Sequence, residues 1–471
     1  MKILITLLAI FFIVSLSSIN WRFSVKSVLF IVVIEGALRK WFLPQASDFI
    51  YFLKDFVLIG AYINYYLLSN LESKPAIKNH IINIFVFLIS GWCLVQAFNP
   101  SLGSPILGIV GLKGYLLNIP LIWINQTLFK SEYDLYRFFR TYIILTIPIG
   151  ILGIVQFFSS PLSPINAYIN SAEAKSIATF GDGNNFARIT GSFSYLDTYV
   201  VYLIVSFGLL ISLFSIPTTV KWKCTYIVAL ILVIVNSFMT GSRSCVFALA
   251  LIILGYMCIK SFFQPAKLLR FLKQLLLPTL IIVTAASIWF RPAIDAFSSR
   301  VNNSDDSSSR VTIRFTQPFD YINDINYKGI DGYGTGATQA TSKAISKLLS
   351  LPEGEALPVP VEEEPLRIML ELGPIGFTFW YGLKLSILIT LWTLFCQVKS
   401  SFLRELVLIA FMIQAIRFDT HLVLHHVFSV YYWFFSSFIF MLPRLDQINN
   451  RYQQQFLQQN VEATNFPGSS N

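Results

Sequence analysis

Long apolar stretches separated by short polar connections dominate this sequence. Most of the stretches are about as long as a helix that crosses the bilayer core, roughly 17–25 residues, and the longer 366–397 is expected to tilt or to begin above the membrane. The stretches cover residues 3–18, 25–43, 49–69, 81–98, 106–126, 141–158, 197–215, 224–240, 245–260, 274–290, 366–397, 403–418 and 422–442. Residues 25–43 fit least well, because Glu35, Arg39 and Lys40 interrupt them. The pattern predicts an all-α polytopic membrane protein with about 12–13 transmembrane helices.

Composition supports a membrane protein and argues against a soluble one. The 471 residues are 55% hydrophobic and 13% charged, whereas soluble domains are about 25% charged. Residues 1–19 resemble a signal peptide, but the many spans that follow favour an uncleaved first helix. The five cysteines form no CxxC pair, so we interpret them as packing residues.

The net charge of +10 predicts orientation in the membrane rather than nucleic-acid binding. Alternate connections carry the basic residues Arg22, Lys26, Lys74, Lys78, Lys130, Arg137, Arg140, Lys221, Lys223, Lys260, Lys267, Arg270, Lys273, Lys399, Arg404, Arg444 and Arg451. The short connections 44–48 and 99–105 between them carry none. We therefore expect the basic set to be cytoplasmic and the long loops 159–196 and 291–365 to face outward.

This topology divides the chain into five regions. N-terminal membrane helices fill residues 1–129, and central membrane helices with the first outer loop fill 130–290. The large outer loop 291–365, expected to contain short helices, precedes the C-terminal membrane helices 366–444. The Gln- and Asn-rich residues 445–471 are expected to form a disordered cytoplasmic tail.

Several cations break the positive-inside pattern. They are Arg39, Lys40, Lys54, Lys113, Arg188, Arg243, Arg291, Arg310, Arg314, Arg367 and Arg417. A charge in the membrane costs at least about 2.5–3.5 kcal/mol, so such residues snorkel, pair or bind a ligand. Lys54 can form an ion pair with the adjacent Asp55, and Arg417 can form one with Asp419. As a group, they predict an anionic ligand at the outer surface, with a lipid diphosphate the foremost candidate.

The sharpest local feature is Thr240-Gly241-Ser242-Arg243-Ser244, between two apolar stretches. Ser242 or Ser244 can cap the following helix, whose free N–H groups then point outward beside Arg243. These groups together suit a phosphate. The alternative is an ordinary capped turn with a snorkelling arginine.

The large outer loop contains two further candidate features. Arg310 and Arg314 share one face if their segment is helical, and Gly332, Gly334 and Gly336 alternate with other residues. These glycines let the backbone approach a ligand closely, or they form a flexible turn. They do not open a Rossmann unit, because no strand–turn–helix pattern surrounds them.

Acidic and histidine residues complete the candidates. Glu362, Glu363 and Glu364 are candidate general bases or a solvated helix start, and Glu371 follows inside the span. His421, His425 and His426 share one helical face, where packing histidines are more common than metal ligands. We therefore predict no metal site.

Four motifs in order across residues 130–400 resemble the O-antigen ligase and O-antigen polymerase family of bacterial inner membranes. They are Gly191-Ser192-Phe193-Ser194-Tyr195, Gly241-Ser242-Arg243-Ser244, the Arg310/Arg314 pair followed by Gly332-x-Gly334-x-Gly336, and Glu371-Leu372-Gly373-Pro374-Ile375-Gly376. Residues 35–41, Phe52-Leu53-Lys54-Asp55 and Gly111-Leu112-Lys113-Gly114 look like one branch of that family.

The resemblance implies a metal-independent glycosyltransferase with no cofactor that acts at the periplasmic face. Its partners would be an undecaprenyl-diphosphate-linked glycan and a glycan or lipid acceptor, within the bacterial inner membrane. Arg243 with Arg310 or Arg314 would bind the diphosphate, assisted by Ser242, Ser244 and Lys113. Ligases of this kind carry a His-Asn pair where this chain has Glu362 and Glu363. This departure favours an O-antigen or exopolysaccharide polymerase, with Glu362 or Glu364 in the catalytic base role.

Two other functions compete with this one. A flippase or transporter of the same lipid-linked oligosaccharide needs charges through the membrane depth and commonly has two related halves, but we find no internal repeat. A metal-dependent glycosyltransferase of another family needs an acidic pair in the first outer connection, which contains only Asp48.

Overall fold

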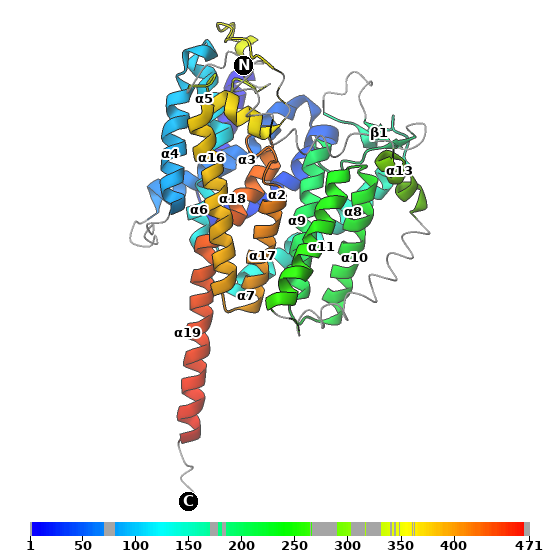
Figure 1. Ribbon diagram of the computed structural model, residues 1–471, viewed down its shortest axis with the longest axis vertical. Helices are drawn as coiled ribbons and strands as arrows, with labels where there is room; N and C mark the ends of the chain where they lie inside the picture. The colour runs from blue at the N-terminus through cyan, green and yellow to red at the C-terminus, as the bar shows by residue number, and fades with distance from the viewer. Residues whose placement is uncertain are drawn as a thin grey trace, which may run out of the picture.

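The structure is a computed structural model in which the chain is an all-α polytopic membrane protein. It describes residues 2–69, 81–169, 178–180, 185–263, 265, 290–302, 316, 331–339, 342, 345–347, 349–359, 361 and 363–465. Within these residues, seven helices are long and apolar enough to cross a membrane. Figure 1 shows the helices side by side in one bundle, from which α19 projects.

Helices account for nearly all of the described regular structure. The N-terminal helices are α1 (Lys2–Ser17), α2 (Trp21–Ala37), α3 (Ser47–Tyr62), α4 (Ile81–Ala97), α5 (Pro105–Leu116) and α6 (Leu121–Ile124). The central helices are α7 (Glu132–Ile144), α8 (Thr146–Phe158), α9 (Leu196–Phe214), α10 (Val220–Met239), α11 (Arg243–Phe263) and α13 (Arg291–Asn302). The C-terminal helices are α16 (Glu364–Gln397), α17 (Ser401–Ile416), α18 (His426–Ser436) and α19 (Phe438–Asn465). A π-helical turn, η1 (Leu38–Phe42), extends α2, and β1 (Thr179–Phe180) pairs antiparallel with β2 (Phe186–Ala187).

Each expected apolar stretch other than 274–290 coincides with helical structure, and residues 274–289 lie outside the described residues. Some of the stretches are interrupted where the backbone departs from a continuous helix. Residues 106–126 divide into α5 and α6. The long α16 bends at Gly373, whose φ of 69° is followed by Pro374, a residue without a backbone N–H. The kink divides the 34 residues of α16 at Gly373.

The C-terminal tail differs from the expected disordered segment. Helix α19 continues from Phe438 to Asn465, beyond the last apolar residues of the bundle. Residues 444–465 contain neither glycine nor proline, and glutamine is a good helix former. Low hydrophobicity therefore predicted the solvent exposure of residues 451–455 but not their conformation.

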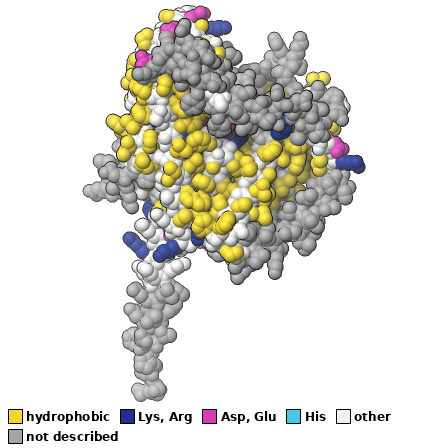
Figure 2. All heavy atoms as spheres, in the orientation of Figure 1, with side chains coloured by type: hydrophobic (Ala, Val, Ile, Leu, Met, Phe, Trp, Pro, Cys, Tyr) yellow, Lys and Arg dark blue, Asp and Glu magenta, His cyan; other side chains and the backbone are white. Residues whose placement is uncertain are grey.

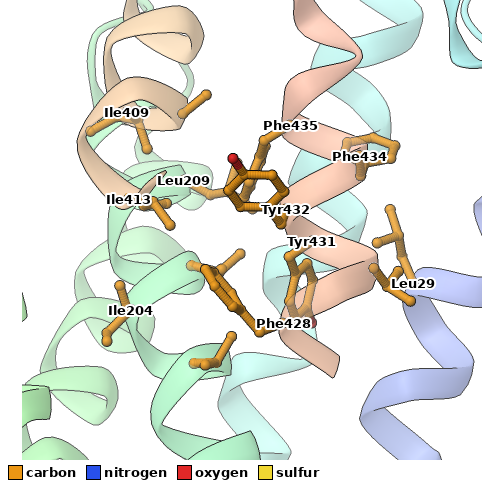
Figure 3. Close-up of a cluster of buried hydrophobic side chains, with 14 of the residues drawn as sticks. Leu29, Ile204, Leu209, Ile409, Ile413, Phe428, Tyr431, Tyr432, Phe434 and Phe435 are labelled. Carbon is orange, nitrogen blue, oxygen red and sulfur yellow. The ribbon is translucent and has the colours of Figure 1, made fainter. Parts of the chain in front are cut away.

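The core around α18 is aromatic and apolar. Figure 3 shows Phe428, Tyr431, Tyr432, Phe434 and Phe435 of α18 facing side chains of three other helices. These partners include Leu29 of α2, Ile204 and Leu209 of α9, and Ile409 and Ile413 of α17. Their packing fixes the position of α18, and therefore the position of His426 at its first turn.

The basic connections gather at one end of the bundle, which we call the basic end. Arg444 donates to the carbonyls of Gln126 and Phe129 at 3.3 and 3.1 Å, and Arg22 donates to the carbonyl of Thr127 at 3.1 Å. Figure 2 shows Lys and Arg side chains where α19 leaves the bundle, below a broad hydrophobic surface. The described part of the basic set thus lies together, as the alternating charge pattern predicts.

The opposite end, which we call the loop end, contains residues 39–47, 188–195, 240–243, 331–339 and 417–425. Side-chain contacts join these segments: Arg39 contacts Ser47 and Ser194, and Arg188 contacts Thr240. The strands β1 and β2 and the helix α13 lie at this end (Figure 1). The described cations Arg39, Lys40, Arg188 and Arg243, which break the positive-inside pattern, lie in these segments.

Candidate functional site

A buried network of charged side chains joins α2, α3 and α18 at the loop end. The carboxylate of Glu35 lies 3.2 Å from Lys54 Nζ and 3.5 Å from Arg39 NH1. His426 Nε2 lies 3.3 Å from Glu35 Oε1. The side chains of Glu35, Lys54 and Arg39 are at most 5% exposed, and that of His426 is 12% exposed. Glu35 therefore connects three cationic or basic partners within the protein.

Helix geometry explains this pairing and corrects the expected one. Lys54 and Asp55 are neighbours in sequence, but successive residues of a helix point in different directions. Lys54 faces Glu35, whereas Asp55 lies 2.6 Å from Lys113 Nζ on α5. Of the charges that interrupt residues 25–43, Glu35 is thus paired with Lys54 on α3 and with Arg39 of its own segment.

The ring of Tyr51 lies among the cations of this network. Its centroid is 4.5 Å from Lys54 Nζ, 4.8 Å from Lys113 Nζ and 5.0 Å from the Arg39 guanidinium carbon. His426 meets the same ring edge to face, with centroids 4.8 Å apart. An aromatic face attracts cations without neutralising them, so it holds positive charges close together.

The segment Gly191–Tyr195 packs directly on this network. Arg39 donates to Ser194 Oγ at 3.1 Å, while Lys40 donates to Thr190 Oγ1 at 3.0 Å and to the Gly191 carbonyl at 2.8 Å. Gly36 permits the approach, because a Cβ there would lie 2.5 Å from the Ser192 carbonyl oxygen. Two motifs about 150 residues apart in the sequence therefore form one structural unit.

These residues have an excess of positive charge. We define the charge cluster as Glu35, Arg39, Lys40, Lys54, Asp55 and Lys113; its four cations exceed its two carboxylates by two. Lys113 is the most exposed member of the three salt bridges, with 30% of its side chain accessible. The arrangement favours an anion that approaches from the side of Lys113.

A second group of cations surrounds the Thr240–Ser244 turn. Arg188 Nε donates to the Thr240 carbonyl at 3.1 Å, and Arg243 is the first residue of α11. Both arginine side chains are partly exposed. Gly241 has a φ of 60° and packs against the ring of Phe180 from β1. Ser242 occupies the expected cap position, and its hydroxyl lies 3.0 Å from Ser244 Oγ.

The glycine run contacts protein rather than an open site. Gly332, Gly334 and Gly336 have φ values of 64°, 91° and 89°. A Cβ on Gly332 would lie 2.7 Å from Gly373 N, and one on Gly334 would lie 2.7 Å from Leu102 Cγ. Close packing against α16, Leu102 and α5 therefore accounts for these glycines, and their contact with a ligand stays a prediction.

Glu371 holds this run in place. Its carboxylate accepts hydrogen bonds from Tyr115 Oη at 2.7 Å, Gly336 N at 3.1 Å and Thr338 N at 3.0 Å. Arg367 donates to the Thr338 carbonyl at 3.2 Å and also contacts the Thr338 hydroxyl. The carboxylate is fully buried and is satisfied by hydrogen bonds, so we assign it a structural role.

The candidate base Glu364 is the first residue of α16 and is not part of an exposed acidic surface. Glu364 is fully buried, 2.9 Å from Lys384 Nζ, and accepts a hydrogen bond from Leu422 N at 2.9 Å. A carboxylate paired with a cation is a weak base, so the base role expected for Glu364 does not fit this environment. Glu362, Arg310 and Arg314 lie outside the described residues.

The three histidines have different surroundings. His425 Nδ1 accepts from Phe428 N at 3.2 Å and caps α18. His426 instead contacts Glu35, a pairing that sequence analysis missed because the partner lies almost 400 residues away. The described residues contain no group of three metal-ligating side chains.

Comparison of the sequence with models of protein families finds no match, and comparison with curated proteins finds none either.

Proposed function

We propose that this chain is a metal-independent glycosyltransferase that joins glycan repeats carried on a lipid diphosphate. It works at the loop end, which we place on the periplasmic side of a bacterial inner membrane. The product is an O-antigen or exopolysaccharide, and polymerisation is favoured over ligation. The observation that carries the proposal is the excess of buried cations at the end opposite the basic end.

The leaving group explains why such a site needs cations. Transfer of a sugar from a lipid diphosphate leaves negative charge on the diphosphate, and preorganised donors lower the barrier by stabilising that charge. Arg243 is suited to this role, because its guanidinium offers a planar fork at the N-terminus of α11. Lys113 supplies a partly exposed cation from the charge cluster.

The position of polar groups favours transfer over transport. A flippase must provide a polar route for its glycan between the two membrane faces. The described core between the ends is filled by side chains such as Phe428, Tyr431 and Ile413. The described cations Arg39, Lys40 and Arg243, which break the positive-inside pattern, lie at the loop end. This distribution suits a reaction at one face of the membrane (Figure 3).

The test uses purified protein in lipid nanodiscs with a synthetic undecaprenyl-diphosphate-linked repeat. We expect a ladder of longer lipid-linked glycans from the wild-type protein and none from Arg243→Ala. Lys223→Ala, which removes an exposed cation of the basic set, is the matched control and should retain the ladder. Movement of the lipid across vesicles without lengthening would instead indicate the flippase.

A further inference from the structure

The pairing of His426 with Glu35 extends the proposed function to the acceptor. We infer that His426 is the catalytic base that takes the proton from the attacking sugar hydroxyl, and that Glu35 is its positioning residue. The inference rests on the proposed function. In the role of catalytic base, His426 at the first turn of α18 takes the place of Glu362 and Glu364.

The geometry assigns a different task to each imidazole nitrogen. His426 Nε2 lies 3.3 Å from Glu35 Oε1, within reach of a bond from a protonated Nε2 to the carboxylate. A neutral imidazole that donates from one nitrogen has its lone pair on the other. Nδ1 is then the proton acceptor, and the carboxylate stabilises the imidazolium that forms.

The other described acid and base groups nearby are already engaged. Asp55 pairs with Lys113, Glu364 pairs with Lys384, and Glu371 accepts hydrogen bonds from Tyr115 and two backbone amides. His425 caps α18 through Nδ1. Histidine also has an ordinary pKa near neutrality, which suits proton transfer at physiological pH.

His426 lies beside the cations that we assign to the diphosphate. Its ring contacts Tyr51, whose face also holds Lys113 and Arg39. Lys54 and Asp55 on α3 and Glu35 on α2 are the charged groups that interact with the imidazole, along with His425 on its own segment. The cations that attract a diphosphate therefore adjoin the group that activates the hydroxyl.

The step balances without a metal or a redox partner. The acceptor O–H bond breaks and its proton goes to His426 Nδ1, while the oxygen forms a bond to the anomeric carbon of the donor. The bond from that carbon to the diphosphate oxygen breaks, and its electron pair leaves with the diphosphate. The imidazolium later returns the proton to solvent.

The experiment separates proton transfer from donor binding. Single-turnover transfer and donor affinity are measured for full-length His426→Ala in nanodiscs, with Glu35→Gln and His425→Asn alongside. We expect His426→Ala to reduce the transfer rate about 10²–10⁴-fold with donor affinity changed less than threefold. Glu35→Gln should reduce the rate by a smaller factor. His425→Asn should keep the wild-type rate, because asparagine also caps helices well.

Added imidazole supplies a readout that a structural role would not change. It should restore transfer at least tenfold in His426→Ala and leave Glu35→Gln unchanged. Full transfer by His426→Ala, parallel loss of donor binding, or failure of imidazole to restore the rate would each overturn the assignment. Failure of the wild-type protein to transfer would instead overturn the proposed function on which it rests.

Discussion

Lys54 Nζ lies 3.2 Å from a carboxylate oxygen of Glu35, and the two side chains are only 1% and 2% exposed. This ion pair joins α3 to α2, and the second oxygen of the same carboxylate contacts His426 on α18. The buried carboxylate of Glu35 thereby links the three helices α2, α3 and α18. The junction fixes the geometry on which the proposed chemistry depends.

The close packing of Gly36 gives a first prediction. Gly36→Ala should destabilise the protein and abolish transfer, because the new Cβ would overlap the backbone of residues 192–194. Gly91→Ala on α4 is the control, since a Cβ there meets nothing within 4 Å. Melting temperatures in detergent should fall for Gly36→Ala and stay level or rise for Gly91→Ala. Equal melting temperatures would show that the two segments do not pack as described.

The buried Glu364–Lys384 pair gives a second prediction. Glu364→Gln leaves Lys384 buried without its charge partner, which typically costs about 3–5 kcal/mol. The double variant Glu364→Gln/Lys384→Met should recover most of that stability and should retain transfer. Thermal unfolding and transfer by the folded fraction measure the two effects. An inactive, fully stable double variant would restore Glu364 as a candidate base.

Arg243 gives a third prediction. Arg243→Ala should slow transfer by raising its activation free energy by about 2–4 kcal/mol, the effect of losing one oxyanion-hole donor. Arg243→Lys should recover little of it, because an ammonium cannot form the guanidinium's bidentate contact. Initial rates compared with Lys223→Ala provide the measurement. Wild-type rates for Arg243→Ala would assign this arginine a structural role.

Orientation gives a fourth prediction. In a cysteine-free background, an impermeant thiol reagent applied to intact cells with a permeable outer membrane should label Ala356→Cys and spare Lys221→Cys. Both positions are exposed, and Lys221 belongs to the basic set. Ala356 follows Glu355, whose N–H donates to the Ser101 carbonyl, close to Asn99, which contacts Gly332 of the loop end. Lysed cells should show labelling of both. The reverse pattern in intact cells would place the charge cluster on the cytoplasmic side.

The sequence predicted the fold well, because its main signal is the length of apolar stretches. It also indicated that the loop end would collect cations, since Arg39, Lys113 and Arg243 break an otherwise regular charge pattern. It paired Lys54 with the wrong acidic residue, because proximity along the chain is a poor guide to partners on separate helices.

The acid–base residues were harder to predict. Glu364 seemed available as a base because the sequence does not show its partner. Lys384, which lies 20 residues later in the same helix, donates to the Glu364 carboxylate. His426 seemed to be a packing residue because Glu35 becomes its neighbour only when α2 and α18 meet. The alternating glycines suggested ligand contact, whereas tight packing of backbone on backbone requires the same residues.

The central claim is metal-independent transfer from a lipid diphosphate at the charge cluster. The most direct test is chain lengthening of a synthetic undecaprenyl-diphosphate-linked repeat by the purified protein, with and without excess chelator. The account predicts the same rate in both conditions and no stimulation by added magnesium or manganese. Lengthening that stops with chelator and returns with either metal would contradict the mechanism, and failure to lengthen under every condition would contradict the proposed function.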